Sequence, residues 1–99
     1  MPRRAARVDD NQPEIVQALR NMGCSVQPLH TVGGGCPDLL VGWEEKNYLM
    51  EIKDGSKIPS AQKLTPQQEK FFDEWLGQRV VVTSPEEAMG YILADSVPW

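Results

Sequence analysis

Two short apolar runs with charged ends constrain the fold of this chain more than any other feature. The first run follows Asp38 and ends at Trp43, and the second extends from Tyr48 to Lys53. A short polar stretch separates them, which predicts an antiparallel hairpin. Side chains alternate faces along a strand, so Glu51 and Lys53 share one face. The hairpin brings Asp38 beside them, which places two carboxylates and an ammonium on one small patch of sheet.

The sequence leaves two registers open for this hairpin. If the turn centres within the pair Glu44-Glu45, Asp38 lies opposite Glu51. A turn centred one residue later places Asp38 opposite Lys53 instead. Both registers keep the three groups adjacent.

Two facing carboxylates repel each other. A bound divalent cation would reverse that cost, because hard cations prefer oxygen ligands. This set of groups is what a metal-assisted phosphodiester hydrolase needs. The plainer interpretation of the same residues is a pair of strand-end acids on a solvated face, with Lys53 as an ion-pair partner of Glu51.

Capping signals and hydrophobic spacing predict the other elements. The expected helices cover residues 12–22, 66–76 and 85–93, and the expected strands cover residues 26–32, 38–43, 48–53 and 79–83. The last of these strands is β-branched throughout, which favours a buried position. A helix between two strands allows a parallel crossover. The sequence therefore predicts an α/β fold of order α-β-β-β-α-β-α, with a mixed sheet flanked by helices.

Length and composition indicate one domain over residues 1–99, with residues 1–10 as a polar N-terminal arm. No apolar run approaches the roughly 18 residues that would span a bilayer. The basic start at Arg3, Arg4 and Arg7 is followed by two aspartates and not by an apolar stretch, so it does not resemble a signal peptide. We expect a cytoplasmic protein, in a bacterium or a phage-infected cell.

The net charge of −4 argues mildly against tight, nonspecific binding to nucleic acid, which depends on neutralising phosphates. That objection is weakened by the clustering of basic residues. Lys53, Lys57 and Lys63 lie close together in the sequence, and a homodimer would pool two basic faces.

The two cysteines, Cys24 and Cys36, are expected to be free thiols in a reducing compartment. Their symmetric spacing about His30 suggests zinc at first sight. Structural zinc sites use four ligands, usually in closely spaced pairs, and this sequence has no such pair.

Spacing alone favours plain roles for several other residues. Glu14 and Gln68 each stand at a position typical of a helix cap. The aromatic residues are most simply assigned to the core; these are Trp43, Phe71, Phe72 and Trp75.

Three motifs in order resemble the PD-(D/E)xK nuclease superfamily, and within it the virus-type replication-repair nuclease group. The motifs are Gly35-Cys36-Pro37-Asp38-Leu39-Leu40-Val41, Glu51-Ile52-Lys53 and Leu64-Thr65-Pro66-Gln67-Gln68-Glu69-Lys70-Phe71. The resemblance covers residues 11–93. Small stand-alone phage members of the group have a similar size, and they share a restriction-endonuclease-like core.

The resemblance implies a role for each matching residue. Asp38 and Glu51 match the ligands of Mg²⁺ or Mn²⁺, with the backbone carbonyl of Ile52 as a third ligand. Lys53 matches the lysine of the motif. Glu14 matches an acidic residue on the first helix that joins the site, directly or through a water. Gln68 matches a glutamine that packs onto the site from the following helix, and Gln67 is the weaker match.

The resemblance also implies an activity and partners. The expected protein is a metal-dependent endonuclease that acts as a homodimer on branched DNA, such as a four-way (Holliday) junction, in DNA repair or recombination. Two rival classes remain: a non-catalytic nuclease-like module for DNA binding or assembly, and a small protein-interaction domain whose acids only decorate the surface.

Overall fold

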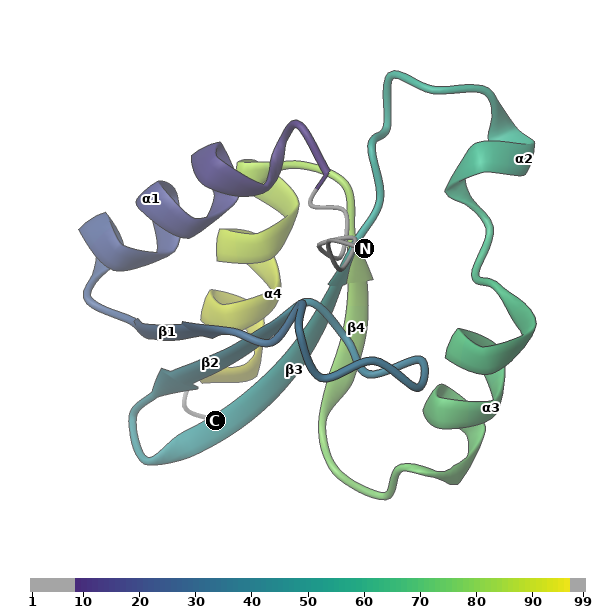
Figure 1. The fold of residues 1–99 in the computed structure, drawn as a ribbon. Helices are drawn as coiled ribbons and strands as arrows, with labels where there is room; N and C mark the ends of the chain where they lie inside the picture. The colour runs from purple at the N-terminus through teal and green to yellow at the C-terminus, as the bar shows by residue number, and fades with distance from the viewer. Residues whose placement is uncertain (1–8, 97–99) are drawn as a thin grey trace, which may run out of the picture.

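A four-stranded mixed sheet organises the structure, and the computed structural model describes residues 9–96 (Figure 1). The strands are β1 (Ser25–Pro28), β2 (Leu39–Trp43), β3 (Lys46–Ile52) and β4 (Arg79–Val82), and the helices are α1 (Gln12–Met22), α2 (Pro59–Gln62), α3 (Pro66–Glu74) and α4 (Pro85–Ser96). The strands pair in the order β1-β2-β3-β4, the first two pairs antiparallel and the last parallel. The expected mixed sheet flanked by helices is confirmed, with the short α2 as an unpredicted addition.

Parts of the expected N-terminal arm lie outside the described residues, including its three arginines, and so does Trp99. None of the helices within residues 9–96 combines the length and the apolar character needed to cross a membrane.

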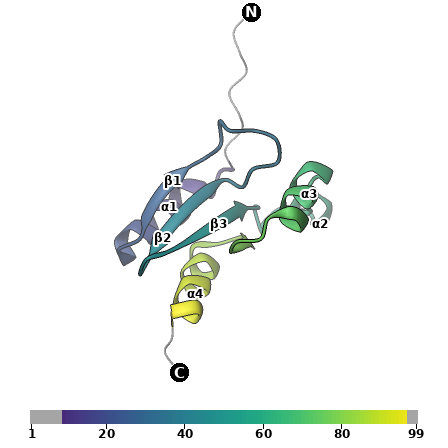
Figure 2. The same ribbon diagram turned by 90° about the horizontal axis from the view of Figure 1, so that it is seen from below.

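The two faces of β3 serve different purposes. Tyr48, Met50 and Ile52 are fully buried and belong to a core that includes residues of α1 and α4, such as Ile15 and Ile92. Side chains alternate along the strand, so Glu51 points to the opposite face. Helices α1 and α4 pack together against the sheet, and α2 and α3 stand apart from them on the side of β3 and β4 (Figures 1 and 2). The face of β3 that carries Glu51 is therefore separate from the main core.

The hairpin adopts the earlier of the two registers. Leu39 pairs with Met50, and the strands close on the two-residue turn Glu44-Glu45. Both turn residues have positive φ, 50° and 65°, as a tight hairpin of this kind requires. Continuing the register by one residue places Asp38 opposite the next residue of β3, which is Glu51.

Helix α3 contributes little to the core. It begins with the predicted capping box between Thr65 and Gln68, but none of its residues is fully buried. It ends at Glu74, earlier than expected, and Trp75 is 45% exposed and Leu76 97% exposed. The assignment of Trp75 to the core was therefore wrong.

The other aromatic residues assigned to the core are half-buried. Trp43 packs against the core, while Phe71 stacks on Trp75 with ring centroids 5.2 Å apart. Phe72 is likewise half-buried.

Two strands differ from the expectation. β1 ends at Pro28 and does not reach residue 32. The N–H of Leu29 still donates to the carbonyl of Asp38 in the same register, but the chain then turns, and the N–H of Val32 donates back to the carbonyl of Leu29. β4 is an edge strand, and of its residues only Val82 is buried, so the expected burial of the whole strand was wrong.

Helix α4 extends to Ser96, past the expected end at residue 93. Near its end, the carboxylate of Asp95 accepts hydrogen bonds from Tyr48 Oη at 2.7 Å and from Lys46 Nζ at 3.3 Å. These contacts hold the last turn of the helix against β3.

The glycine loop, Gly33-Gly34-Gly35, lies against the start of α3. All three glycines have positive φ, and a Cβ added to Gly35 would overlap the backbone carbonyl of Gln67. The same addition at Gly34 would meet nothing within 4 Å. Close approach of this loop to α3 therefore depends on the missing side chain of Gly35.

We expect Gly35→Ala to destabilise the protein more than Gly34→Ala. Both variants incur the left-handed backbone cost of about 1–2 kcal/mol, and only the first also pushes the loop away from α3. Denaturant unfolding of the two variants and the wild type measures the difference. Equal losses of stability in the two variants would show that the close contact between Gly35 and α3 does not contribute to the free energy of unfolding.

Candidate active site

Glu51 is the centre of the candidate site. It stands near the end of β3 and is 3% exposed. Its Oε2 lies 3.8 Å from Lys53 Nζ and accepts a hydrogen bond of 3.1 Å from Gln68 Nε2. Its other oxygen, Oε1, is buried and has no hydrogen-bond partner. A buried carboxylate with one free oxygen is costly unless a further positive group or proton satisfies it.

Asp38 is fixed beside Glu51 by the backbone of β3. Its Oδ2 accepts a hydrogen bond of 2.7 Å from the N–H of Ile52. The preceding residue, Pro37, is fully buried and holds the entry to β2 in place. The two carboxyl groups thus come from neighbouring strands, as the hairpin pattern predicts.

Gln68 links the site to α3. Its Oε1 accepts from Lys53 Nζ at 2.9 Å and from the backbone N–H of Thr65, also at 2.9 Å, while its Nε2 donates to Glu51. One side chain therefore completes the helix cap and contacts two site residues. The capping role and the site role, which appear as alternatives in the sequence, coexist in the structure.

The pKa of Glu51 reflects this crowded environment. Burial, the charge of the neighbouring Asp38 and the hydrogen bond that a proton on Glu51 would make to Asp38 together raise it from an ordinary 4.5 to about 8. Lys53 acts in the opposite direction. Burial also raises the pKa of the Cys36 thiol, with further contributions from Glu51 and then Asp38. With no cation bound, Glu51 therefore carries a proton at neutral pH, and so does Cys36.

Two residues near the site escaped the sequence-based assignment. Asn11 stands at the N-cap position of α1 but makes no side-chain cap; its Nδ2 donates to the carbonyls of Lys53 at 3.2 Å and Thr83 at 3.1 Å. The pKa of Asp9 is raised by burial and next by the charge of Asp38, so this carboxyl lies near the site. The two consecutive acids Asp9 and Asp10, shortly before α1, were the sequence feature that could have indicated this carboxyl.

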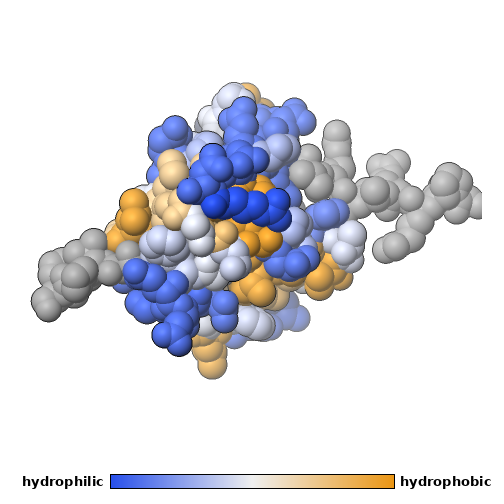
Figure 3. Space-filling view, turned by 90° about the vertical axis from the view of Figure 1, so that its left-hand side faces the viewer, coloured by the Kyte–Doolittle hydropathy of each residue, from blue (hydrophilic) through white to orange (hydrophobic). Residues whose placement is uncertain are grey.

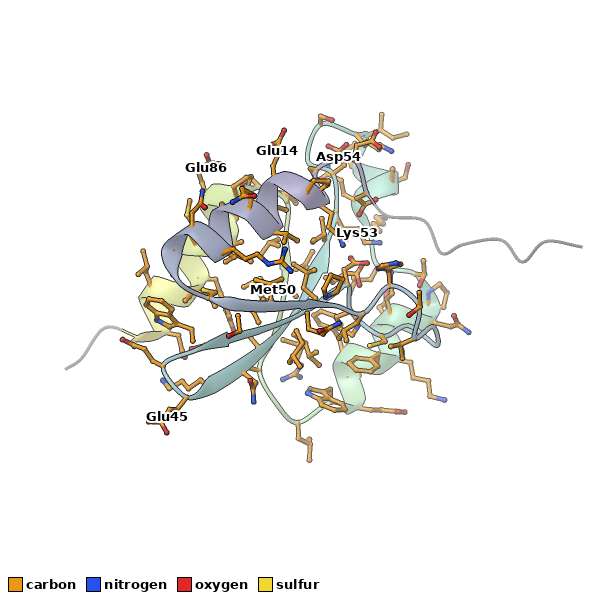
Figure 4. All side chains as sticks on the ribbon, turned by 60° about the vertical axis from the view of Figure 1, so that its left-hand side comes forward. Glu14, Glu45, Met50, Lys53, Asp54 and Glu86 are labelled. Atoms are coloured by element: carbon orange, nitrogen blue, oxygen red, sulfur yellow. The ribbon has the colours of Figure 1, made fainter. Side chains whose placement is uncertain are left out.

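Glu14 does not join the other four predicted residues. It is exposed, and with Glu86 and Met89 it lines a groove between α1 and α4. Figure 4 shows Glu14 pointing outward from α1 and away from Lys53. On the face of the molecule drawn in Figure 3, hydrophobic residues form separate patches among hydrophilic ones. Asn11, the residue directly before α1, instead reaches the end of β3.

The donor set suits a hard cation. Asp38 and Glu51 supply carboxylate oxygens, and Glu51 Oε1 is buried without a partner. Mg²⁺ and Mn²⁺ favour carboxylate, carbonyl and water oxygens. Within residues 9–96, no three Asp, Glu, His or Cys side chains form a metal-binding group. A cation here would therefore rely on the two carboxylates, a backbone carbonyl and water.

Comparison of the chain with protein-family models, with curated proteins and with solved structures found no match.

The raised pKa of Glu51 predicts how stability depends on pH. Between pH 4.5 and 8 the folded state holds a proton on Glu51 that the unfolded state has lost. The free energy of unfolding therefore falls as pH rises through this window. Urea unfolding at several pH values in EDTA should show wild type losing stability relative to Glu51→Gln, which has no such proton.

Mn²⁺ supplies the control for this pH effect. Because a cation binds the ionised carboxylate, adding Mn²⁺ at pH 8 should restore stability to wild type and leave Glu51→Gln almost unchanged. A wild-type stability that follows the same pH profile as Glu51→Gln would contradict the assigned environment of Glu51.

Proposed function

We propose that this protein is a metal-dependent, structure-selective DNA endonuclease that hydrolyses phosphodiester bonds, and specifically a four-way-junction resolvase of DNA repair or recombination. One observation carries the proposal: Asp38, Glu51, Lys53 and Gln68 meet at the end of β3, where Glu51 is buried with one free oxygen. A buried acid beside a half-buried one serves stability poorly, because removing a carboxylate from water is costly and apolar residues of similar volume are often as stabilising. Its presence is better explained by a ligand.

Asp38, Glu51 and the Ile52 carbonyl would hold Mg²⁺ or Mn²⁺. When bound, such a cation polarises a phosphate and lowers the pKa of a coordinated water. The chain's own part is to keep the two carboxyl groups in place. Asp38 is held by the Ile52 N–H, and Glu51 is held by Gln68.

Lys53 supplies positive charge where negative charge grows in the reaction. Its side chain is 12% exposed, and its ammonium is oriented by Gln68 Oε1 at 2.9 Å. A fixed ammonium in a partly desolvated site stabilises a developing phosphorane more than a mobile one in water does. We assign the 3′-oxygen as the leaving group, so the products carry 5′-phosphates.

A second candidate function is a non-catalytic nuclease-like module that binds DNA or assembles with other proteins. The observation that favours it is the raised pKa of Glu51. A proton on Glu51 would form a hydrogen bond to Asp38 and satisfy the acid pair without any metal. Metal dependence therefore separates the two candidates.

We propose that the enzyme works as a homodimer in the cytoplasm of a bacterium or a phage-infected cell. The exposed apolar residues after α3, Trp75 and Leu76, support a second copy of the chain as partner. Two active sites related by a two-fold axis suit a two-fold symmetric junction.

Cleavage of labelled four-way-junction, flap and linear duplex DNA with Mg²⁺ or Mn²⁺ tests the activity. We expect wild type to cut the junction in preference to the duplex. Asp38→Ala should abolish cleavage because it removes a metal ligand. Lys53→Ala should reduce the rate by about 10²–10³-fold, the usual effect of removing one charge-stabilising group.

Matched controls are Asp73→Ala on the exposed face of α3 and Lys46→Ala at the other end of β3. Both should cut like wild type. Absence of wild-type cleavage with either metal, together with DNA binding in EDTA, would replace the nuclease with the non-catalytic module. Equal cleavage of every substrate would remove the junction selectivity.

The dimer is tested by replacing the most exposed apolar side chain. Leu76→Asn should shift the protein from dimer to monomer in sedimentation velocity, because Leu76 is 97% exposed and has no role in the fold of one copy. Ile58→Asn, at a site that is 69% exposed on α2's N-cap, is the matched control and should stay dimeric. A wild type that is monomeric at assay concentration and still cuts junctions symmetrically would contradict the proposal.

A further inference from the structure

We propose that the loop between β3 and α3 holds the phosphate backbone of the DNA next to the active site. We define this lysine arm as residues 54–64, which include α2 and carry Lys57 and Lys63. The choice of DNA as partner rests on the proposed function. The position, charge and order of the arm are properties of the structure itself.

Charge is distributed unevenly along the chain. Residues 54–64 contain two lysines and one aspartate and carry a net charge of +1, so the rest of the chain carries −5. The single acid, Asp54, uses its Oδ1 to accept hydrogen bonds from the N–H of Ser56 at 2.9 Å and its hydroxyl at 2.7 Å. The arm is thus a positively charged segment in an acidic protein.

The arm begins and ends at the candidate site. It leaves β3 directly after Lys53, and shortly after its end Gln68 returns to contact both Lys53 and Glu51. The N–H of Lys57 donates to the carbonyl of Asp54 at 3.1 Å, so Lys57 is held close to the residue that follows Lys53. In Figure 1 the arm stands out from the sheet at the end of β3. Its lysines therefore lie on the approach to the acid pair.

Both lysines are available to a ligand. Lys57 and Lys63 are exposed, and the ion pairs found within residues 9–96 involve other lysines, Lys46 and Lys53. Helix α2 has no buried residue, so the arm contributes little to the core. An exposed cationic loop with so small a part in folding needs another explanation.

The arm is nevertheless ordered by its own hydrogen bonds. Gln62 Nε2 donates to the carbonyl of Lys57 at 2.6 Å and to that of Gly55 at 3.3 Å. A Cβ added to Gly55 would lie 3.2 Å from the Cβ of Thr83, so the arm packs closely against the residue after β4. Fixing a loop before binding reduces the entropy lost on binding. The two ammonium groups are therefore carried by a backbone that is already ordered before binding.

Lysine ammonium groups bind phosphates as point charges and release condensed counterions. Such contacts do not depend on base sequence, and they position the backbone while other groups act on it. In this protein the group acted on would be the phosphate beside Lys53. The arm would thus offset the repulsion between DNA and the acidic remainder of the chain.

Salt dependence of DNA binding tests the arm separately from cleavage. Fluorescence anisotropy with a labelled duplex and a labelled four-way junction is recorded over a series of salt concentrations, in EDTA and in Ca²⁺. We expect Lys57→Ala/Lys63→Ala to bind both DNAs more weakly and to reduce the slope of log K against log salt by about 1.8 for the duplex, from 0.9 per phosphate contact.

The control Lys46→Ala removes one positive charge, half as many as the arm variant, at the far end of β3, about 20 Å from Lys53 at 3.3 Å per residue. It should keep the wild-type slope. Gln62→Ala keeps both charges and loosens the arm, so it should weaken binding without reducing the slope by a comparable amount.

The outcomes separate this inference from the proposed function. A reduced salt slope in the arm variant alone supports phosphate binding by the lysine arm, even if wild type cuts no DNA and the nuclease proposal fails. If the arm variant keeps the wild-type slope and affinity, phosphate binding by the lysine arm is contradicted, even if cleavage is normal. An equal loss of slope per charge removed in Lys46→Ala also contradicts the inference, since the effect would then reflect net charge alone.

Discussion

Burial of the Glu51 carboxylate is the constraint on which the rest of the structure depends. At 3% exposure it has lost almost all contact with water, and its partners come from three separate segments. Asp38 arrives through the hairpin register, Lys53 follows two residues later on the same face of the chain, and Gln68 arrives from α3. Hairpin, strand end and helix cap are therefore arranged around one acid, whose free oxygen still lacks a partner.

Local rules predicted part of this arrangement. Alternation along a strand and the hairpin pattern placed Asp38 beside Glu51, and the capping box placed Gln68 at the start of a helix. The contact of Gln68 with the site was implied only by the resemblance. The position of Glu14 could not be predicted from local rules. The rotation of α1 is set by the packing of Ile15 against the sheet, a tertiary contact that no local pattern encodes. The structure consequently turns Glu14 to solvent.

Helix α3 shows a different limit of sequence reasoning. Its aromatic residues have the spacing of a core-facing helix, yet none is fully buried, and the chain continues into the exposed Trp75 and Leu76. An amphipathic pattern indicates that one face of a helix packs against apolar residues. It does not indicate whether those residues belong to the same chain or to a partner. The hydrogen bonds of Gln68, the bond from Arg79 Nε to the Phe72 carbonyl and the close contact at Gly35 then position a helix that the core does not hold.

Charge placement connects these observations to function. A net charge of −4 would repel DNA if it were spread evenly, but at physiological salt a phosphate responds mainly to charges within about 8 Å. Near the end of β3 those charges include the acid pair, Asp9, Lys53 and the lysine arm. A phosphodiester brought to two carboxylates is repelled unless positive charge is present on both sides of it. In the proposed nuclease, a cation on the acids and the ammonium groups along the approach would meet that requirement together.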